Sequence, residues 1–236
     1  MYRVTVVMFL MICLTVAVVG QKKLKPWKEW SKSDAQKVLD DSPWAHPQVD
    51  MELTDANRLN RSRVVGTGDE DVRIRMNSER AVYAIRFLSA RPVRQAFVRM
   101  IQLQQKDLNP DTVSRMSAFA EKPSEDLIVV AVTVEGPDAK PIEKVMQVIR
   151  IASTALLRTD TYLERSDGKR VYLDEYTPPG RDGFGARFIF PRIVDGKPFL
   201  SSEFTTVRFV SELSSSIKLN MLYKVKDMII DGKVEF

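Results

Sequence analysis

Hydrophobic and polar residues repeat along the chain with two different periods, and the change falls near residue 155. Before it, apolar residues recur at the spacing of helices over residues 31–40, 92–103, 109–122 and 141–153. Strands are predicted over residues 72–76 and 82–89, where polar and apolar positions alternate, and over 127–134. That last run is almost wholly apolar and β-branched, which is typical of a strand buried on both faces.

Short signals mark where several of these helices begin and end. Ser31 and Asp34 have capping-box spacing before the first helix, and Pro43 follows its end. Pro92 stands where a first helical turn tolerates proline, and Asn109 precedes the helix that follows. These positions set the expected boundaries to within a few residues.

After residue 155 the period becomes two, which is typical of antiparallel strands. Turn signals at residues 166–169 and 230–233 each predict a hairpin. We therefore expect an α+β protein, in which an N-terminal helix and a mixed α/β portion are followed by a C-terminal antiparallel β-sandwich. The expected divisions are a signal peptide, a tether with a tryptophan-bearing helix, the mixed portion and the sandwich, over residues 1–20, 21–50, 51–154 and 155–236.

Residues 1–20 have the pattern of a secretory signal peptide, with Arg3 before an uncharged apolar run and Gly20 before a cleavage site at Gln21. The run is shorter than the roughly 20 residues that a spanning helix needs, so an uncleaved anchor is the less favoured alternative. Cleavage removes Cys13, the single cysteine, and leaves no disulfide. We expect an exported bacterial protein, periplasmic or secreted, that meets the membrane only through this segment before cleavage.

The shortage of histidine and cysteine excludes most familiar catalytic and metal sites. His46 is the single histidine among the 236 residues, so any serine–histidine site must use it, and no Gly-x-Ser-x-Gly motif is present. Zinc sites with three histidines are impossible within one chain. We predict no catalytic residue, no metal site and no cofactor, and we expect the protein not to be an enzyme.

Two weaker chemical possibilities stay open at this point. Gly66 and Gly68 follow an apolar pair as in a phosphate-binding loop, but the third glycine is missing and three acids follow, so a surface loop is favoured. The same acids lack the spacing of a calcium loop. Hydrolysis by two carboxylates needs only a suitable pair across a cleft, and 31 acidic residues prevent the sequence from testing it.

Basic residues are concentrated between residues 58 and 106, where ten arginines and one lysine face four acids, a net charge of +7. Arg91, Arg94 and Arg99 are expected on the polar side of one helix. Such a patch suits an anionic envelope component or a protein partner, while nucleic acid is excluded for an exported chain without a binding motif. The alternative, an ordinary solvated helix face, is favoured.

The three tryptophans all lie around the first helix. Trp27, Trp30 and Trp44 form a candidate partner platform, because tryptophan is enriched at binding hot spots. The favoured alternative is that they pin this helix onto the rest of the protein, since each buries on the order of 200 Å². Together with the three arginines they are the candidate binding residues.

Three stretches of the chain carry a family resemblance: the tryptophan-bearing segment 26–45, the segment Ser89-Ala90-Arg91-Pro92-Val93-Arg94, and the pair formed by 188–192 and 224–236. They resemble an uncharacterised family of exported bacterial proteins. A more distant similarity is to proteins named for a Gly-Trp-x-Thr-Asp motif, which this chain lacks. The resemblance implies export and supplies no catalytic residue.

The expected function is therefore that of an exported, non-enzymatic binding or scaffolding protein of the bacterial envelope. Two alternatives stay open. One is a carboxylate-dependent hydrolase of envelope or extracellular polymers, which needs paired acids in a cleft. The other is a carrier of an apolar ligand, which needs a large dry cavity in the sandwich.

Overall fold

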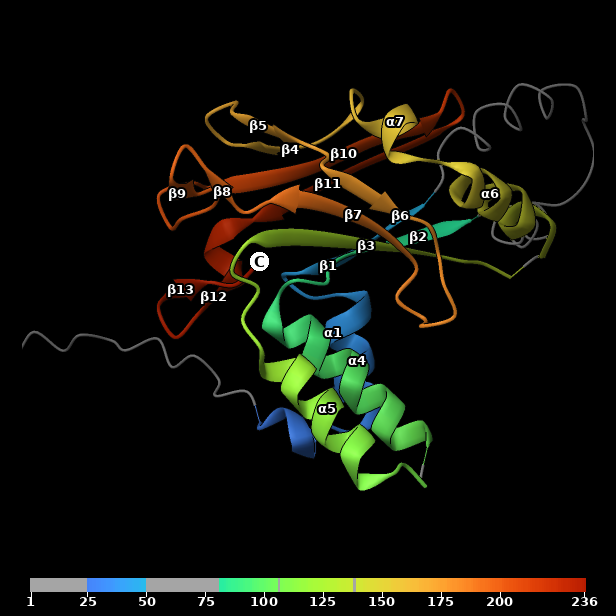
Figure 1. Cartoon of the computed structure of the whole chain (residues 1–236), viewed down its shortest axis with the longest axis vertical. Coiled ribbons are helices and arrows are strands. Elements are labelled where there is room, and N and C mark those ends of the chain that lie inside the picture. Colours follow the sequence, from blue (N-terminus) through green and yellow to red (C-terminus); the bar gives the residue numbers. More distant parts are fainter. Residues whose placement is uncertain (1–24, 50–80, 106, 138) are drawn as a thin grey trace, which may run out of the picture.

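The computed structural model describes residues 25–49, 81–105, 107–137 and 139–236, which form two antiparallel sheets with helices against one of them (Figure 1). This architecture confirms the predicted α+β class. The predicted export signal, the loop with Gly66 and Gly68, and the strand predicted over 72–76 lie outside the described residues. No helix within the described ranges is long and apolar enough to cross a membrane.

The first sheet contains five strands, and its central strand is the apolar run predicted to be buried on both faces. Ile128, Val130 and Ala131 of that strand are fully buried, although they do not all point to the same face. All neighbouring strands are antiparallel. In spatial order the strands are β1 (Ala45–Val49), β2 (Val82–Phe87), β3 (Leu127–Glu135), β7 (Ala186–Pro191) and β6 (Glu175–Thr177).

The second sheet contains four strands and follows the period-two pattern closely. Its strands in spatial order are β11 (Ile217–Lys224), β10 (Thr206–Ser214), β4 (Thr161–Arg165) and β5 (Arg170–Tyr172). The predicted hairpin turn joins β4 to β5, and Gly168 has a φ of +83° that favours glycine there. All neighbouring strands are antiparallel.

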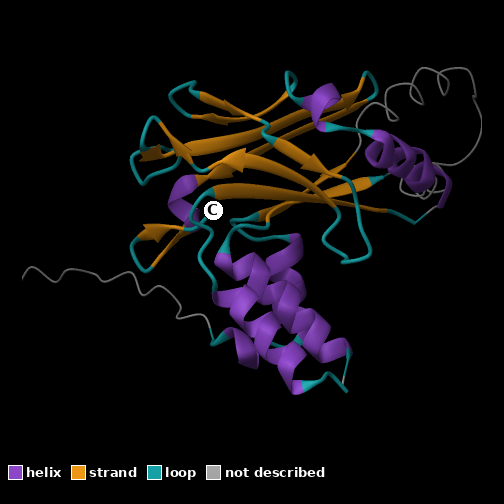
Figure 2. Cartoon of the chain, in the orientation of Figure 1, coloured by secondary structure: helices purple, strands orange, loops and turns teal. Residues whose placement is uncertain are grey.

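The two sheets pack face to face (Figure 2). Aromatic side chains from both sheets meet between them. Phe209 of β10 lies edge-on against Phe188 of β7, with ring centroids 5.2 Å apart. Tyr223 of β11 packs on Phe87 of β2, and its hydroxyl donates to the carbonyl oxygen of Ile85 at 2.8 Å. These side chains are fully buried, so the space between the sheets is a filled hydrophobic core.

The sandwich is not built only from residues 155–236. Strands β1, β2 and β3, which precede residue 155, form one sheet with β6 and β7, which follow it. The side chain of Gln48 on β1 also bonds the backbone of Lys218 and Asn220 on β11. The physical reason is that the apolar run over β3 needs strand partners on both sides, and β7 is an amphipathic strand that supplies one of them.

Three helices cover the outer face of the first sheet, below it in Figure 1. They are α1 (Lys32–Asp40), α4 (Arg91–Gln104) and α5 (Pro110–Glu121), and a short turn, η1 (Trp27–Glu29), precedes them. The predicted capping box is confirmed, because Ser31 and Asp34 exchange hydrogen bonds at 3.1 and 2.9 Å. Proline in the first turn of α4 and Asn109 at the N-cap of α5 also confirm the predicted starts.

The remaining elements close the ends of the sandwich. Helix α6 (Ala139–Ile151) confirms the predicted helix, and α7 (Thr154–Leu157) lies at one end of the second sheet (Figure 1). The chain ends in η2 (Val225–Met228) and a hairpin of β12 (Ile229–Ile230) and β13 (Lys233–Val234), while β8 (Ile193–Val194) and β9 (Lys197–Pro198) form another. Asp231 and Gly232 both have positive φ, as the predicted two-residue turn requires.

Candidate functional site

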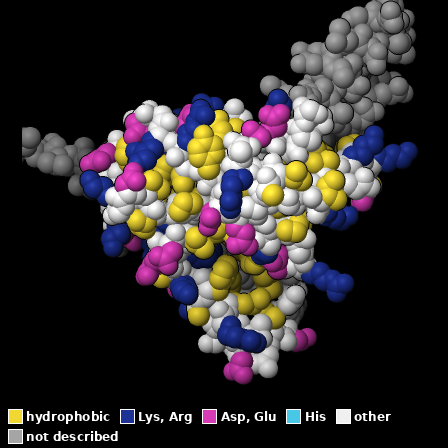
Figure 3. Space-filling view, turned by 45° about the horizontal axis from the view of Figure 1, so that its top comes forward, with side chains coloured by type: hydrophobic (Ala, Val, Ile, Leu, Met, Phe, Trp, Pro, Cys, Tyr) yellow, Lys and Arg dark blue, Asp and Glu magenta, His cyan; other side chains and the backbone are white. Residues whose placement is uncertain are grey.

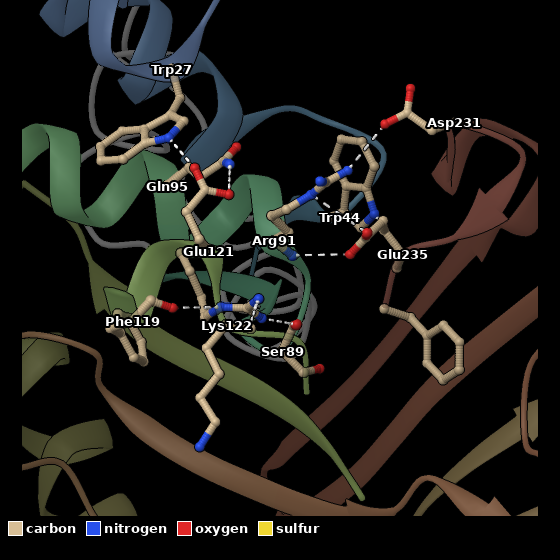
Figure 4. Close-up of polar contacts among 12 residues, drawn as sticks. Trp27, Trp44, Ser89, Arg91, Gln95, Phe119, Glu121, Lys122, Asp231 and Glu235 are labelled. Atoms are coloured by element: carbon tan, nitrogen blue, oxygen red, sulfur yellow. Dashed lines mark hydrogen bonds and ion pairs between the residues drawn. The ribbon is translucent and has the colours of Figure 1, made fainter. Parts of the chain in front are cut away.

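The three candidate tryptophans are buried and each indole N–H donates a hydrogen bond. Trp27, Trp30 and Trp44 are only 6%, 5% and 5% exposed. Trp27 donates to the carboxylate of Glu121, Trp30 to a backbone carbonyl, and Trp44 to the carbonyl oxygen of Glu235 at 2.7 Å (Figure 4). They join η1, α1 and the start of β1 to the rest of the protein, as the favoured alternative predicts.

Arg94 does not lie on the solvent side of its helix, and that expectation is wrong. It is 5% exposed, and its guanidinium donates to the backbone carbonyls of Ser89, Phe119 and Lys122. Two of these carbonyls belong to the last turn of α5, where the helix leaves its acceptors unpaired. The side chain is therefore drawn inward to satisfy the end of a neighbouring helix, and burial lowers its pKa.

Arg91 and Arg99 are half-buried and also have internal partners. Arg91 pairs with Asp231 and Glu235 at 3.4 and 3.5 Å (Figure 4). Its backbone N–H also donates to Glu235 at 3.4 Å, which compensates for the lack of a side-chain cap at the start of α4. Arg99 donates to the carbonyl oxygen of Trp30 at 2.7 Å.

The six candidate residues form three pairs along α4, and we call them together the tryptophan–arginine cluster. Arg91 and Trp44 meet at Glu235, and Arg99 bonds directly to Trp30. Arg94 and Trp27 both bond the C-terminal end of α5. The structure brings the predicted residues together, but it directs their polar atoms toward the protein.

Two further structural arginines were missed by the sequence analysis. Arg86 on β2 is 3% exposed and bonds the carbonyl of Leu39 and the hydroxyl of Thr133, with Asp40 and Glu135 at 3.5 and 3.8 Å. Burial lowers its pKa and the two carboxylates oppose that change. The alternation of β2 places Arg86 opposite its apolar residues, but only the packing of α1 shows that this face is covered.

Arg192 is the second of these arginines. It donates to the main-chain oxygen of Phe236, and its guanidinium lies 3.7 Å from the centre of that ring. Burial lowers the pKa of Arg192 to about 10. No local sequence pattern joins these residues, because they are 44 positions apart.

His46 lies at the boundary between the two sheets. Its ring lies against Tyr223 with centroids 5.0 Å apart, and Nδ1 is 3.9 Å from the carboxylate of Asp41. Burial lowers the pKa of His46, and the nearby carboxylate only partly opposes this. The ring packs on Tyr223 and faces a carboxylate rather than a serine or cysteine nucleophile, which suits a structural role for His46.

No carboxyl group in the described part of the chain shows the raised pKa of a general acid. The carboxyl groups with displaced pKa values are Asp34, Asp167 and Asp195, and all three pKa values are lowered because hydrogen bonds or a lysine stabilise the charged form. A glycosidase acid needs a raised pKa. Among the described residues, no group of three His, Cys, Asp or Glu side chains is placed to hold a metal ion.

One open groove lies between η1, α4 and α5, and we call it the helix groove. Its volume is about 340 Å³. Its lining is mixed, with Lys28 as the charged group, two glutamines and a serine beside two apolar side chains; the residues are Lys28, Gln102, Gln105, Leu108, Val113 and Ser117. Paired acids do not line it, so it does not supply the cleft that the hydrolase alternative requires.

Within the described ranges no layer of helices covers the outer face of the second sheet, in contrast to that of the first (Figure 1). Exposed and half-buried side chains alternate there with the buried positions of the strands. Figure 3 shows this side obliquely, with hydrophobic side chains scattered among charged ones. We call it the outer sheet face; it consists of Tyr162, Glu164, Arg170, Tyr172, Thr206, Arg208, Val210, Glu212, Lys218, Asn220, Leu222 and Lys224.

Comparison of the chain with protein-family models, with curated proteins and with solved structures found no match. The fold and the site are therefore interpreted from their own geometry. The resemblance to exported bacterial proteins stays an expectation from the sequence.

Proposed function

We propose that this chain is an exported, non-enzymatic binding or scaffolding protein of a bacterial envelope, and that it binds through the outer sheet face. The observation that carries the proposal is the contrast between the tryptophan–arginine cluster and the outer sheet face, which both contain aromatic and cationic residues. The tryptophan–arginine cluster is used for internal packing, whereas the outer sheet face keeps aromatic and cationic side chains open to solvent.

The groups best suited to chemistry support a non-enzymatic role. His46 is packed on Tyr223, and the buried tyrosine hydroxyl itself donates to a backbone carbonyl. Among the carboxyl groups that the structure describes, the displaced pKa values are those of Asp34, Asp167 and Asp195 and are lowered, which favours the charged form rather than a proton donor.

The filled core argues against the apolar-carrier alternative. Phe188, Phe209 and Tyr223 meet between the sheets, and each is fully buried. A carrier needs a cavity of roughly 300 Å³ or more that is lined mainly by apolar groups. The helix groove has a comparable volume, but its lining is mixed, with Lys28 and two glutamines among the lining residues, and it lies outside the sandwich.

Export is proposed from the sequence, since the N-terminal segment carries the features of a signal peptide. The test begins with expression of the whole chain, including its own leader, in a bacterial host. N-terminal sequencing should give Gln21, and the protein should be recovered from the periplasm or the medium. A tag at the C-terminus is avoided because Phe236 is only 3% exposed.

The same preparation tests binding and turnover. We expect part of the exported protein to sediment with the envelope fraction, and the purified protein to leave envelope polymers undegraded over hours. Retention in the cytoplasm overturns the proposal, as does release of reducing sugars or peptides that scales with enzyme concentration. A variant of the outer sheet face should reduce sedimentation, whereas Arg115→Gln on the exposed side of α5 serves as a matched charge control.

A further inference from the structure

The outer sheet face is ordered in cross-strand rows. Tyr172, Tyr162 and Val210 are direct neighbours on β5, β4 and β10, and Asn220 of β11 continues the row. Four strands at the normal spacing make this row roughly 14 Å long. A flat row of this length suits an extended ligand better than a compact one.

The aromatic end of this row offers an exposed ring on a fixed support. Tyr172 is 47% exposed, and its ring centroid is 5.7 Å from that of Tyr162. Arg170 lies 4.3 Å from the centre of the Tyr162 ring and pairs with Glu164, which holds these side chains in place. Ligand binding therefore requires little further ordering of this end of the face.

The face as a whole carries an excess of positive charge. It contains four cations, Arg170, Arg208, Lys218 and Lys224, against two acids, Glu164 and Glu212. Arg170 pairs with Glu164 and Lys218 with Glu212.

Two cations are therefore left for a ligand. The guanidinium of Arg208 donates to the neutral amide oxygen of Asn220 at 2.9 Å. Lys224 is exposed and lies opposite Thr206 on the neighbouring strand. Arg208 and Lys224 are diagonal neighbours across β10 and β11, roughly 7–8 Å apart at Cβ. An anionic ligand can thus meet two cations that form no ion pair within the described part of the chain, with Glu164, the ion-pair partner of Arg170, as the cross-strand neighbour of Arg208.

This arrangement fits an acidic polysaccharide better than an anionic membrane. The apolar residues alternate with charged ones such as Glu164 and Glu212, so they do not form a continuous area that inserts among lipid chains. A sugar ring has an apolar face that packs on Tyr172, hydroxyls that bond to Asn220, and an acid group that pairs with Arg208.

We propose that the outer sheet face binds an acidic polysaccharide, with sugar rings stacked on Tyr172 and beside Tyr162 and their acid groups held by Arg208 and Lys224. This inference rests on the proposed function as a binding protein. It adds the chemical class of the ligand and the residues that distinguish it.

The test uses the exported chain, cleaved as in the cell, and calorimetric titration at low and physiological salt. Polygalacturonate is the probe, since it carries one carboxylate on every sugar ring. Dextran supplies rings without charge, polyglutamate supplies charge without rings, and phosphatidylglycerol vesicles supply an anionic membrane. We expect polygalacturonate to bind at least roughly tenfold more tightly than the other three at physiological salt, where purely ionic binding is screened.

Two sets of variants assign the binding to this face. Tyr172→Ser should weaken polygalacturonate binding roughly tenfold, as loss of one well-packed aromatic contact predicts. The double variant Arg208→Gln, Lys224→Gln should weaken it by roughly the same factor, with a smaller effect as salt rises. Ile193→Ser and Arg115→Gln, on other exposed surfaces, are the matched controls and should bind normally. Far-ultraviolet circular dichroism and thermal unfolding establish that each variant is folded.

The outcomes separate the ligand from the function. Equal binding of polyglutamate and polygalacturonate contradicts the proposal, because rings then contribute nothing. Binding of vesicles alone contradicts it in favour of a membrane. If polygalacturonate does not bind while envelope sedimentation persists, the ligand assignment fails and the proposed function stands. If the chain stays in the cytoplasm, the proposed function fails regardless of what the face binds.

Discussion

The two sheets of this protein treat their outward-facing arginines in opposite ways. Arg86 on the first sheet lies under α1, where it bonds the carbonyl of Leu39 and the hydroxyl of Thr133. Arg208 on the second sheet has no helix above it within the described residues, and its guanidinium donates to the amide oxygen of Asn220. A strand arginine therefore becomes structural or available for binding according to what covers its sheet, and not according to the strand pattern itself.

The largest expected difference in stability is between an aromatic residue that packs against the first sheet and one on the outer face of the second. We expect Trp44→Ala to lower the free energy of unfolding by about 3–5 kcal/mol, since it leaves a cavity and an unpaired carbonyl on Glu235. Tyr172→Ala should cost less than about 1 kcal/mol, because the ring is nearly half exposed. Urea unfolding of both variants measures the difference. Equal losses would contradict the division into a packing cluster and an open face.

The arginines provide the next comparison. Arg86→Met removes the buried donor and should cost about 2–3 kcal/mol, because the Leu39 carbonyl and Thr133 hydroxyl lose their partner. Arg208→Gln should change stability by less than about 0.5 kcal/mol. The comparison is made by urea unfolding at one pH. If Arg208→Gln is the more destabilising of the two, Arg208 stabilises the second sheet, and the claim that it is available for binding is contradicted.

A smaller effect concerns the helix that covers the first sheet. Ser31→Ala removes the hydroxyl that accepts from the backbone of Asp34, and loss of such a cap costs about 1 kcal/mol. Amide hydrogen exchange should quicken in α1, while protection in β4 and β10 stays unchanged. Faster exchange throughout the second sheet would show that unfolding of α1 is coupled to unfolding of that sheet more strongly than the contacts suggest.

The smallest effect is a pH dependence at the boundary between the sheets. Burial lowers the folded-state pKa of His46 below its ordinary value of 6.5, so the unfolded chain binds the proton more readily. Stability should therefore fall as the pH drops below about 6.5, down to the lowered folded pKa. His46→Phe retains the ring against Tyr223 and should reduce this loss between pH 7 and pH 5, as urea midpoints would show. An unchanged pH dependence would assign the loss to other groups.

Signals that act within a few residues predicted this fold well. The spacing of Ser31 and Asp34 predicted the start of α1, and the turn at Asp231 and Gly232 predicted the last hairpin. The pairing of β3 with β7 could not be predicted, because it joins segments about 60 residues apart. The apolar sequence of β3 indicates a strand with a neighbour on each side, but it does not identify which strands those are.

The candidate site shows the same limit. The tryptophans were correctly expected to pack, since large aromatic side chains are rarely left exposed around one short helix. Helical periodicity predicts Arg94 on the solvent side, because it describes the faces of one helix and not the neighbours that pack against it. Its actual partners are carbonyls at the end of α5, and only tertiary packing brings that helix end beside it.

The central claim is that ligands meet the outer sheet face and not the tryptophan–arginine cluster. It is tested most directly by titrating the isotope-labelled protein with short oligomers of galacturonic acid and following backbone amide resonances. The account predicts that the shifted resonances belong to the outward-facing positions of β4, β5, β10 and β11, with Tyr172 and Arg208 among the largest changes. Shifts confined to the surroundings of Arg91 and Trp44, or no shifts at all, would contradict it.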